Sequence, residues 1–321
     1  LINVVLSKKF KTKATIGNLN NHIGVPLTLL SFNSETEFGI VEMGANHKKE
    51  IEFLCELATP DYGYITNFGK AHLEGFGGVE GVVIGKSEMY DYLSQNDKLA
   101  FINLEDAIQV EKAKTLKSFS FGVNKEMANV NINSIAANPF VEIQFSNHLI
   151  QTHLIGLYNA NNINAALTIG KYFGVDDLEI KEALESYIPE NNRSQLITKG
   201  TNRIILDAYN ANPSSMSVAV ENFLQLNDSN KIMILGDMFE LGNESPQEHK
   251  VLIDFLNDKK DVVIYFIGRE FYNQRTDSAN YWFFETFNTF SEYLSGNKIE
   301  NSSILIKGSR GMALERTLQF L

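Results

Sequence analysis

Three side chains suited to metal and phosphate chemistry lie at or after the ends of expected strands. Glu42 directly follows the apolar run Phe38–Val41, His72 lies in the loop after the next expected strand, and Lys86 lies in the expected helix Val79–Leu93. The carboxyl ends of parallel strands meet at one edge of a sheet, where ligands collect. Because Mg²⁺ binds carboxylates together with nucleotide phosphates, this order predicts a metal–phosphate site. Helix capping by Glu42 and a solvated charge on Lys86 are the alternatives.

Asparagines gather in two further expected turns. The segment GNLNNHIGVP contains Asn18, Asn20 and Asn21, which are three asparagines within four residues. Asn159 and Asn162 are three residues apart at the start of an expected helix, so they share one face of its first turn. An amide side chain both donates and accepts hydrogen bonds, which suits sugars, peptide groups or the edge of a purine. Ordinary turn formation and helix capping remain the alternative.

The first half of the chain mixes helical patterns with short strands. Between Phe119 and Gly156 four short strands are expected, and the alternation in Val141–Phe145 is typical of a half-exposed antiparallel sheet. The other strands are expected at Phe38–Val41, Tyr62–Asn67 and Lys98–Leu104, and the helices at Leu1–Phe10, Lys48–Ala58, Val79–Leu93, Gly156–Gly174 and Val175–Tyr187.

The second half alternates strands and helices, which predicts a parallel sheet. The loops DAYNANPSS, GDMFELG, GRE and KGSRG follow its strands and should face a ligand. Asn212-Pro213 and a capping box at Ser245–Glu248 predict two helix starts. A polar segment, Pro189–Asn192, predicts a hinge and two domains, 1–191 and 192–321. Strands are expected at Arg203–Asp207, Lys231–Leu235, Val262–Ile267 and Ser303–Ile306, and helices at Ser214–Leu226, Pro246–Asn257, Phe287–Leu294 and Met312–Phe320.

Composition narrows the class of protein. The 321 residues carry a formal net charge of −11 with 44% hydrophobic residues, as expected of a globular protein that does not bind nucleic acid or an anionic membrane. The single cysteine, Cys55, cannot form an internal disulfide, so a reducing compartment, the cytoplasm, is expected. The absence of GxGxxG after any strand argues against a nicotinamide-binding Rossmann protein.

Taken in order, the motifs resemble those of the Mur ligase family. GNLNNHIGVP, IVEMGANH, AHLEGFG, GKSE, NANN, DAYNANPSSM, GDMFELG and KGSRG cover essentially the whole chain, and they are most similar to the branch that adds D-alanyl-D-alanine. The resemblance implies a central parallel-sheet ATPase domain with an added small antiparallel sheet. A Rossmann-like α/β C-terminal domain would follow it.

The resemblance also implies a reaction. ATP would activate the terminal carboxylate of UDP-N-acetylmuramoyl-tripeptide as an acyl phosphate, and the amine of D-alanyl-D-alanine would then displace phosphate. Such an enzyme uses Mg²⁺ and small-molecule substrates, and it acts as a cytoplasmic monomer in peptidoglycan precursor synthesis, which serves cell wall growth, cell shape and division.

Site residues are implied by matching positions in the family motifs. Glu42 and His72 match magnesium ligands, and Lys86 matches a carbamylated lysine beside the metal, so these three form the implied catalytic and metal set. The implied nucleotide contacts are Asn159, Asn162, Arg193, Asp207 and Tyr209, and the implied substrate contacts are Asn18, Asn20, Asn21, Asn210, Asn212 and Ser214.

The chain departs from the family pattern at its front. It begins at Leu1, in what reads as a helix, without the family's N-terminal UDP-binding domain or its phosphate loop. We therefore expect the fragment to be inactive by itself, because a phosphate loop supplies donors to the nucleotide. Two alternatives stay open. One is a sister amide ligase of the folylpolyglutamate or diamino-acid-adding type, and the other is an inactive substrate-binding fragment.

Overall fold

The chain forms two compact units in a computed structural model that describes residues 1–70, 72–189 and 192–321. The first unit contains Leu1–Gly69 and Gly75–Ile188, and the second contains Lys70–Glu74 and Pro189–Leu321. Glu190 and Asn191, which belong to the predicted hinge and border the predicted domain boundary, lie outside the described residues. Ala71 of the AHLEGFG motif lies outside them as well.

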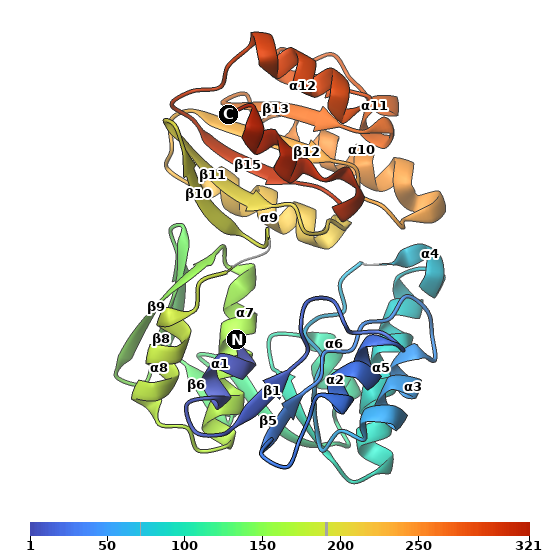
Figure 1. Cartoon of the computed structure of the whole chain (residues 1–321), viewed down its shortest axis with the longest axis vertical. Helices are drawn as coiled ribbons and strands as arrows, with labels where there is room; N and C mark the ends of the chain where they lie inside the picture. Colours follow the sequence, from blue (N-terminus) through green and yellow to red (C-terminus); the bar gives the residue numbers. More distant parts are fainter. Residues whose placement is uncertain (71, 190–191) are drawn as a thin grey trace. The chain divides into compact units, whose positions relative to one another are not determined.

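The first unit is built largely on parallel strands. One sheet has the order β3-β4-β5-β6, and a separate parallel pair joins β1 to β2 (Figure 1). The strands are β1 (Thr12–Ala14), β2 (Phe38–Ile40), β3 (Tyr62–Tyr64), β4 (Leu99–Asn103), β5 (Lys117–Val123) and β6 (Val130–Ile132). The helices among them are α1 (Ile2–Leu6), α2 (Gly24–Leu30), α3 (Glu50–Ala58), α4 (Leu73–Phe76), α5 (Val79–Gln95) and α6 (Ala107–Lys112).

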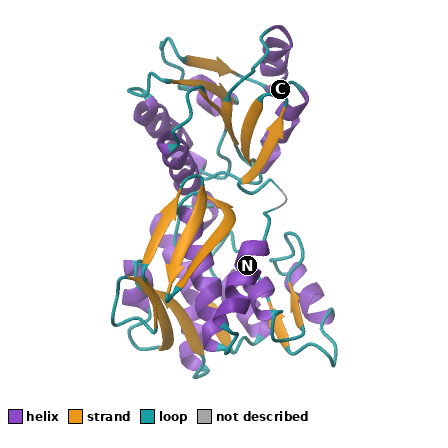
Figure 2. Ribbon diagram, turned by 90° about the vertical axis from the view of Figure 1, so that its left-hand side faces the viewer, coloured by secondary structure: helices purple, strands orange, loops and turns teal. Residues whose placement is uncertain are grey.

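The first unit contains a small antiparallel sheet, as predicted, but this sheet begins later in the chain than expected. It consists of β7 (Ser134–Ala137), β8 (Phe140–Phe145) and β9 (His148–Ile155), and Figure 2 shows it as a separate layer in front of helices. In β8, Val141, Ile143 and Phe145 are buried while their neighbours are partly exposed, as the alternation predicts. β5 and β6, also expected in this region, instead extend the parallel sheet through β4.

Two helices complete the first unit's core. α7 (Tyr158–Tyr172) buries ten of its residues, and α8 (Asp177–Ser186) begins with a capping box on Asp176. A Cβ atom on Gly170 would lie 2.5 Å from a methyl carbon of Val5, so glycine permits the close approach of α7 to α1. α1 ends at Leu6 rather than at the expected Phe10.

The second unit is a six-stranded sheet of order β10-β11-β15-β12-β13-β14 with helices packed on it (Figure 1). All its pairings are parallel except the one between β10 and β11. Its strands are β10 (Gln195–Lys199), β11 (Asn202–Asp207), β12 (Lys231–Gly236), β13 (Val262–Ile267), β14 (Tyr281–Phe284) and β15 (Ser303–Lys307), and its helices are α9 (Pro213–Gln225), α10 (Ser245–Leu256), α11 (Arg269–Asn273) and α12 (Phe287–Gly296).

The parallel α/β prediction is confirmed, and three local predictions need correction. The edge strands β10 and β14 and the short helix α11 were not expected. The predicted helix Met312–Phe320 is instead two 3₁₀ helices, Arg310–Met312 and Leu314–Gln319. Asn212 does form a capping box with Ser215, but the box predicted at Ser245–Glu248 is wrong, because the Ser245 hydroxyl donates to Glu270.

Within the described ranges, no helix combines the length and the apolar character that crossing a bilayer requires.

A buried asparagine in α7 gives a stability prediction. Asn164 is 1% exposed, and neither its amide nitrogen nor its amide oxygen has a hydrogen-bond partner in the described structure. Replacing such a group with an apolar one of similar shape removes a desolvation cost of about 1–3 kcal/mol. We expect Asn164→Leu to raise the free energy of unfolding by about 1 kcal/mol.

Urea unfolding followed by circular dichroism measures this change. Asn161→Leu is the matched control, because Asn161 lies on the same helix but is exposed, and its effect should stay within about 0.5 kcal/mol. A loss of stability in Asn164→Leu would show that the amide is satisfied in solution.

Candidate functional site

In the first unit, the asparagine turn and the glutamate strand come together. The amide nitrogen of Asn20 donates to Glu42 Oε1 at 3.0 Å, and the backbone oxygen of Asn20 accepts from Gly44 at 2.8 Å. The backbone nitrogen of Glu42 donates to the Thr15 hydroxyl at 2.8 Å. The Glu42 carboxylate therefore stands just past β2 with a fixed position and one amide donor. It does not cap α3, whose N-cap residue is Lys49.

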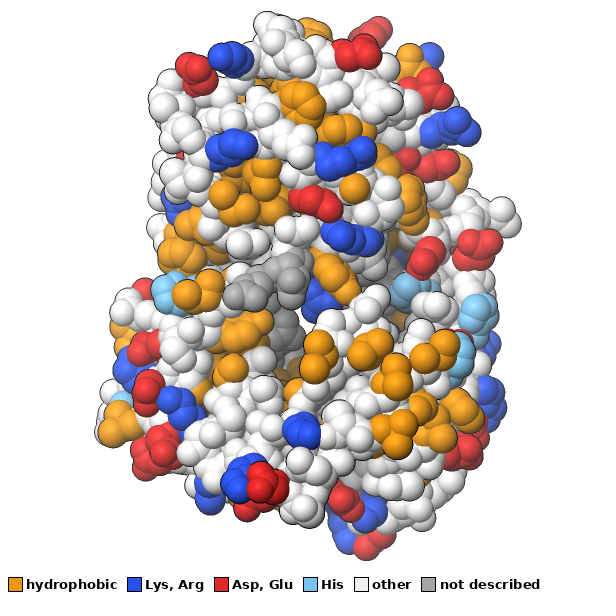
Figure 3. Space-filling model, viewed as in Figure 1, with side chains coloured by type: hydrophobic (Ala, Val, Ile, Leu, Met, Phe, Trp, Pro, Cys, Tyr) orange, Lys and Arg blue, Asp and Glu red, His pale blue; other side chains and the backbone are white. Residues whose placement is uncertain are grey.

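The other two asparagines of this turn differ in their contacts. Asn21 accepts from the backbone nitrogens of Ile23 and Gly24, so it makes the local turn that starts α2, which is the alternative role. The Asn18 side chain is exposed. Exposed apolar side chains surround this turn, among them Ile16 at 78% and Ile23 at 60%, and Figure 3 shows hydrophobic groups gathered on this face of the first unit. The turn thus offers amide and apolar groups together.

Lys86 is a largely buried lysine in α5. Its Nζ donates to the backbone oxygen of Asn67 at 2.8 Å. Burial lowers the pKa of Lys86 from 10.5 to about 8, and the nearby negative charge of Asp106 offsets part of that shift. The buried hydroxyl oxygens of Tyr64 and Tyr90 have no hydrogen-bond partner among the described residues. A substantial neutral fraction of Lys86 near pH 8 makes its amine available as a nucleophile.

His72 belongs to the short segment that groups with the second unit. Its Nδ1 forms an ion-pair contact with Glu240, and the segment is also held by Lys70, whose Nζ lies 2.6 Å from Glu248. Glu42 and Lys86 belong to the first unit, so the convergence of all three residues stays a prediction. In the part of the chain that the structure describes, no three His, Cys, Asp or Glu side chains cluster as a ready metal site.

Asn159 and Asn162 lie on one face at the start of α7, as their spacing predicts. The amide nitrogen of Asn162 donates to Asn159 Oδ1 at 3.2 Å, and Asn159 Nδ2 donates to the backbone oxygen of Ile155 at 2.9 Å. Asn159 is therefore fixed against the end of β9, while Asn162 is exposed. The pair can present amide edges to a flat heterocycle.

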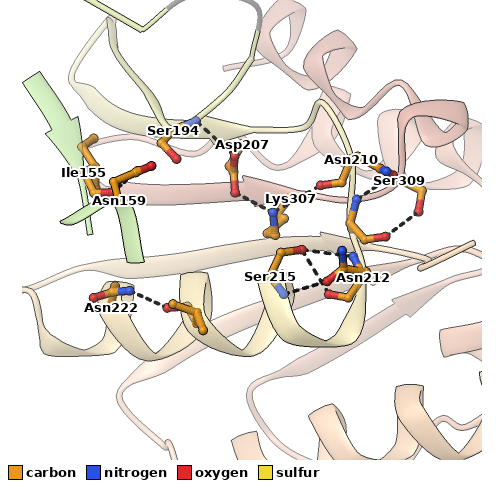
Figure 4. Close-up of polar contacts among 12 residues, drawn as sticks. Ile155, Asn159, Ser194, Asp207, Asn210, Asn212, Ser215, Asn222, Lys307 and Ser309 are labelled. Atoms are coloured by element: carbon orange, nitrogen blue, oxygen red, sulfur yellow. Dashed lines mark hydrogen bonds and ion pairs between the residues drawn. The ribbon is translucent and has the colours of Figure 1, made fainter. Parts of the chain in front are cut away.

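In the second unit, a buried ion pair organises the end of β11. Lys307 Nζ lies 2.5 Å from Asp207 Oδ2, and these side chains are 3% and 14% exposed. Asp207 Oδ1 accepts from the backbone nitrogen of Ser194 at 3.1 Å (Figure 4). The next residue back, Arg193, stacks its guanidinium on the ring of Tyr209 at 4.0 Å. Arg193, Asp207 and Tyr209, which were predicted separately, thus form one cluster.

The remaining predicted residues follow β11. Asn212 caps α9 by accepting from Ser215 at 2.9 Å, and Asn210 Oδ1 accepts from the nitrogen of Ala211 at 2.9 Å. The Ser214 hydroxyl accepts from the backbone nitrogen of Lys70 at 3.0 Å. These groups shape the loop, and their substrate role stays a prediction.

Sequence reasoning missed four residues that hold this edge together. Lys307, Ser309, Asp237 and His249 are 2%, 2%, 3% and 0% exposed, and each bonds to the backbone or side chain of a neighbouring strand, helix or loop. Lys307 and Ser309 lie in KGSRG and Asp237 in GDMFELG, so the motifs marked the loops. A sequence pattern does not show which polar side chain is buried.

Family models match both halves of the chain. The model described as Mur ligase middle domain matches residues 1–170, and the model described as Mur ligase, glutamate ligase domain matches residues 192–310.

Individual relatives match along nearly the whole chain. A protein of Bacillus subtilis named UDP-N-acetylmuramoyl-tripeptide–D-alanyl-D-alanine ligase is 29% identical over 100% of this chain and 72% of its own length. A protein of the same name from Haemophilus influenzae is 31% identical over 96% of this chain and 69% of its own length.

Solved structures give the same picture. A crystal structure of MurF from Acinetobacter baumannii has a TM-score of 0.87 at 31% identity, covering 99% of this chain and 72% of that one. A MurF ligase from Thermotoga maritima in complex with ADP has a TM-score of 0.84, with coverage of 99% and 75%. Its identity is 24%, so that likeness shows the fold alone.

Burial of Lys86 predicts a pH-dependent stability difference. Below about pH 8 both the folded and unfolded chains carry the proton, so the wild type bears the full cost of the buried charge. Between about 8 and 10.5 the unfolded chain binds more protons, so wild-type stability rises with pH. In CO₂-free buffer, Lys86→Met should be more stable by roughly 1–2 kcal/mol at pH 7. The gap should narrow toward pH 10.

Urea unfolding at pH 7, 8.5 and 10 measures this gap. Lys112→Met, at an exposed position of α6, should show no such pH trend. A constant gap across the three pH values would contradict the lowered pKa of Lys86.

The Lys307–Asp207 pair gives a second stability prediction. Lys307→Met leaves a largely buried carboxylate without its cation, which should cost about 3 kcal/mol of unfolding free energy. Adding Asp207→Leu should recover part of that loss, because the unpaired charge is then gone. Lys98→Met, which breaks the exposed pair with Asp61, should cost less than about 1 kcal/mol in the same urea titration. Equal losses for Lys307→Met and Lys98→Met would contradict the assigned burial.

Proposed function

This chain belongs to the Mur ligase family, and we propose that it joins D-alanyl-D-alanine to UDP-N-acetylmuramoyl-tripeptide by ATP-dependent amide ligation. The observation that carries the proposal is the match, along nearly the whole chain, to relatives that bear this activity in their names. We propose residues 1–191 as the ATPase domain and 192–321 as the C-terminal domain, in a cytoplasmic monomer.

The reaction has two steps. A carboxylate oxygen of the tripeptide attacks the γ-phosphorus of ATP, the bond to the bridging oxygen breaks, and ADP leaves. The amine of the dipeptide then attacks the acyl carbon, loses a proton, and expels inorganic phosphate. Neither step needs a redox partner. Both need charge neutralisation on the phosphates and close placement of two substrates.

Glu42 fits a role as a magnesium ligand. Its carboxylate lies beyond a strand end and accepts from the Asn20 amide, and among the described residues it forms no salt bridge. Such oxygen donors suit Mg²⁺, which would draw charge from the phosphate oxygens when bound. His72 and Lys86 are the further residues proposed for this site.

Lys86 is proposed to carry a carbamate. Its neutral amine adds to the carbon of CO₂, a C–N bond forms, and one proton is released to water. The product is a carboxylate-like group on a lysine stem. The lowered pKa of Lys86 supports this step, because only the unprotonated amine reacts.

Two groups of residues are proposed for nucleotide binding. Asn159 and Asn162 offer amide edges to the adenine, and Arg193, Asp207 and Tyr209 form one cluster at the end of β11. Arg193 brings positive charge close to an aromatic face, which suits a nucleotide's phosphate and ring.

The peptide substrates are assigned to the asparagine-containing loops. Asn18, Asn20 and Asn21 are proposed for the tripeptide substrate, and their mixed amide and apolar surroundings suit a peptide. Asn210, Asn212 and Ser214 are proposed for the dipeptide.

An isotope-transfer assay tests the function in the protein as its gene encodes it. With ¹⁸O in the terminal carboxylate of the tripeptide substrate, ligation through an acyl phosphate places one ¹⁸O in the released phosphate. We expect product only with D-alanyl-D-alanine, and not with glutamate or diaminopimelate as the amine. Ligation of glutamate instead would favour a sister ligase, and ¹⁸O-free phosphate would exclude the acyl phosphate.

The same assay tests Lys86. Lys86→Ala should lower turnover at least about 100-fold, because one charged group beside the phosphates is lost. Bicarbonate should not restore activity, whereas a short carboxylic acid should restore part of it. Lys112→Ala is the control at an exposed site. Unchanged turnover in Lys86→Ala would remove this lysine from the mechanism.

A further inference from the structure

A buried histidine of α10 contacts the backbone of the loop that follows β12, residues Asp237–Gly242. His249 is 0% exposed, and its Nε2 accepts from the backbone nitrogen of Met238 at 3.0 Å. Its Nδ1 lies 2.7 Å from the backbone oxygen of Ser245, so Nδ1 carries the proton. An imidazole that accepts at one nitrogen and donates at the other is neutral and has one defined tautomer.

The carboxylate of Asp237 binds other backbone groups, so the Met238 amide is bound by His249. Its two carboxylate oxygens accept from the backbone nitrogens of Glu270 and Phe271, both at 3.0 Å. Gly268 makes room for this carboxylate, because a Cβ atom there would lie 2.2 Å from its Cγ. Asp237 Oδ1 also stands 3.8 Å from His249 Nε2, without displacing the Met238 bond.

A second buried anchor ties this loop to the loop after β11. The hydroxyl of Ser309 accepts from the nitrogen of Phe239 at 2.8 Å and lies 3.3 Å from the backbone oxygen of Ala211. Ala211 sits between Asn210 and Asn212, the residues proposed for the dipeptide (Figure 4). Loop Asp237–Gly242 therefore lies beside the proposed site for the amine substrate.

The tip of the loop presents two side chains of different chemistry. Phe239 is 43% exposed, and Glu240 has a left-handed backbone, φ 62°, with a side chain that is 60% exposed. A glutamate holds this conformation only where the surroundings impose it. The Glu240 carboxylate contacts His72, yet a carboxylate has acceptor sites for more than one donor.

We propose that His249 is a positioning residue, which holds Phe239 and Glu240 toward the incoming dipeptide. Glu240 complements the dipeptide's ammonium group, and the Phe239 ring complements its methyl groups. His249 itself touches no substrate and acts through the Met238 amide. This inference rests on the proposed function and extends it to the recognition of the amine.

Two substitutions separate the bonds of His249. In Gln the side-chain amide reaches the position of Nε2, so His249→Gln can still accept from Met238. In Asn the shorter amide reaches only the position of Nδ1, so His249→Asn keeps the Ser245 bond and loses the Met238 bond. Both variants lose the same edge-on packing of the ring against Phe271, 4.6 Å between centroids. The two variants therefore differ in which of the two bonds of His249 is kept.

The readouts are the exchange rate of the Met238 amide and the Michaelis constants of the protein as its gene encodes it. In His249→Asn we expect Met238 exchange and the dipeptide KM to rise at least about tenfold. The KM for ATP should change less than about threefold. His249→Gln should stay within about threefold of wild type in all three measurements.

The outcomes distinguish this inference from the proposed function. A wild type that does not ligate D-alanyl-D-alanine defeats the proposed function. A ligating wild type with equal dipeptide KM values in the two variants, or with the ATP KM raised as much as the dipeptide KM, defeats the inference. If both variants unfold, Ser309→Ala replaces them, because it removes the other anchor of the loop. An unchanged dipeptide KM in Ser309→Ala would then overturn it.

Discussion

The parallel pairing of β15 with β11 on one side and β12 on the other fixes where three strand ends of the second unit meet. Because β15 is central, Lys307 and Ser309 at its end reach the loops on both sides. Each bond replaces water at a group that is at most 2% exposed, and leaving such a group unpaired is costly. The loops after β11 and β12 are therefore fixed where they leave the sheet, while their tips remain exposed. A ligand-binding edge of a sheet needs this arrangement.

In the first unit, fewer hydrogen bonds fix the side chains at the strand ends. Glu42 leaves β2 and is met by one amide from the preceding turn, so its carboxylate keeps most of its acceptor capacity. Lys86 differs from Glu42, because burial disfavours its charge and the nearby negative charge of Asp106 offsets that effect only in part. Glu42 is exposed, so its free carboxylate is not unfavourable there. The buried Lys86 amine, with its lowered pKa, is the kind of perturbed group that clusters at functional sites.

Much of the fold could be predicted because its signals are local. The β8 alternation and the βα order of the second half both depend on neighbours in sequence, and both are confirmed. The errors occurred where tertiary contacts decide. β5 and β6 join β4 rather than β7, and the segment Met312–Phe320 winds as 3₁₀ turns. Ser245 resembles a cap but bonds to Glu270, a residue from another element.

For the site, the sequence by itself marked candidate side chains and the loops that hold them. Glu42, Asn159 and Asn162 were singled out by type and position, Lys86 by its place after two strand-end residues, and Asp207 by its match to a family motif. Only the tertiary structure decided that Asn20 meets Glu42, that Lys307 neutralises Asp207, and that His249 is a neutral acceptor for the Met238 amide. The reason is physical. Burial, hydrogen-bond partner and tautomer depend on residues that are distant in sequence, and no local pattern encodes those distances.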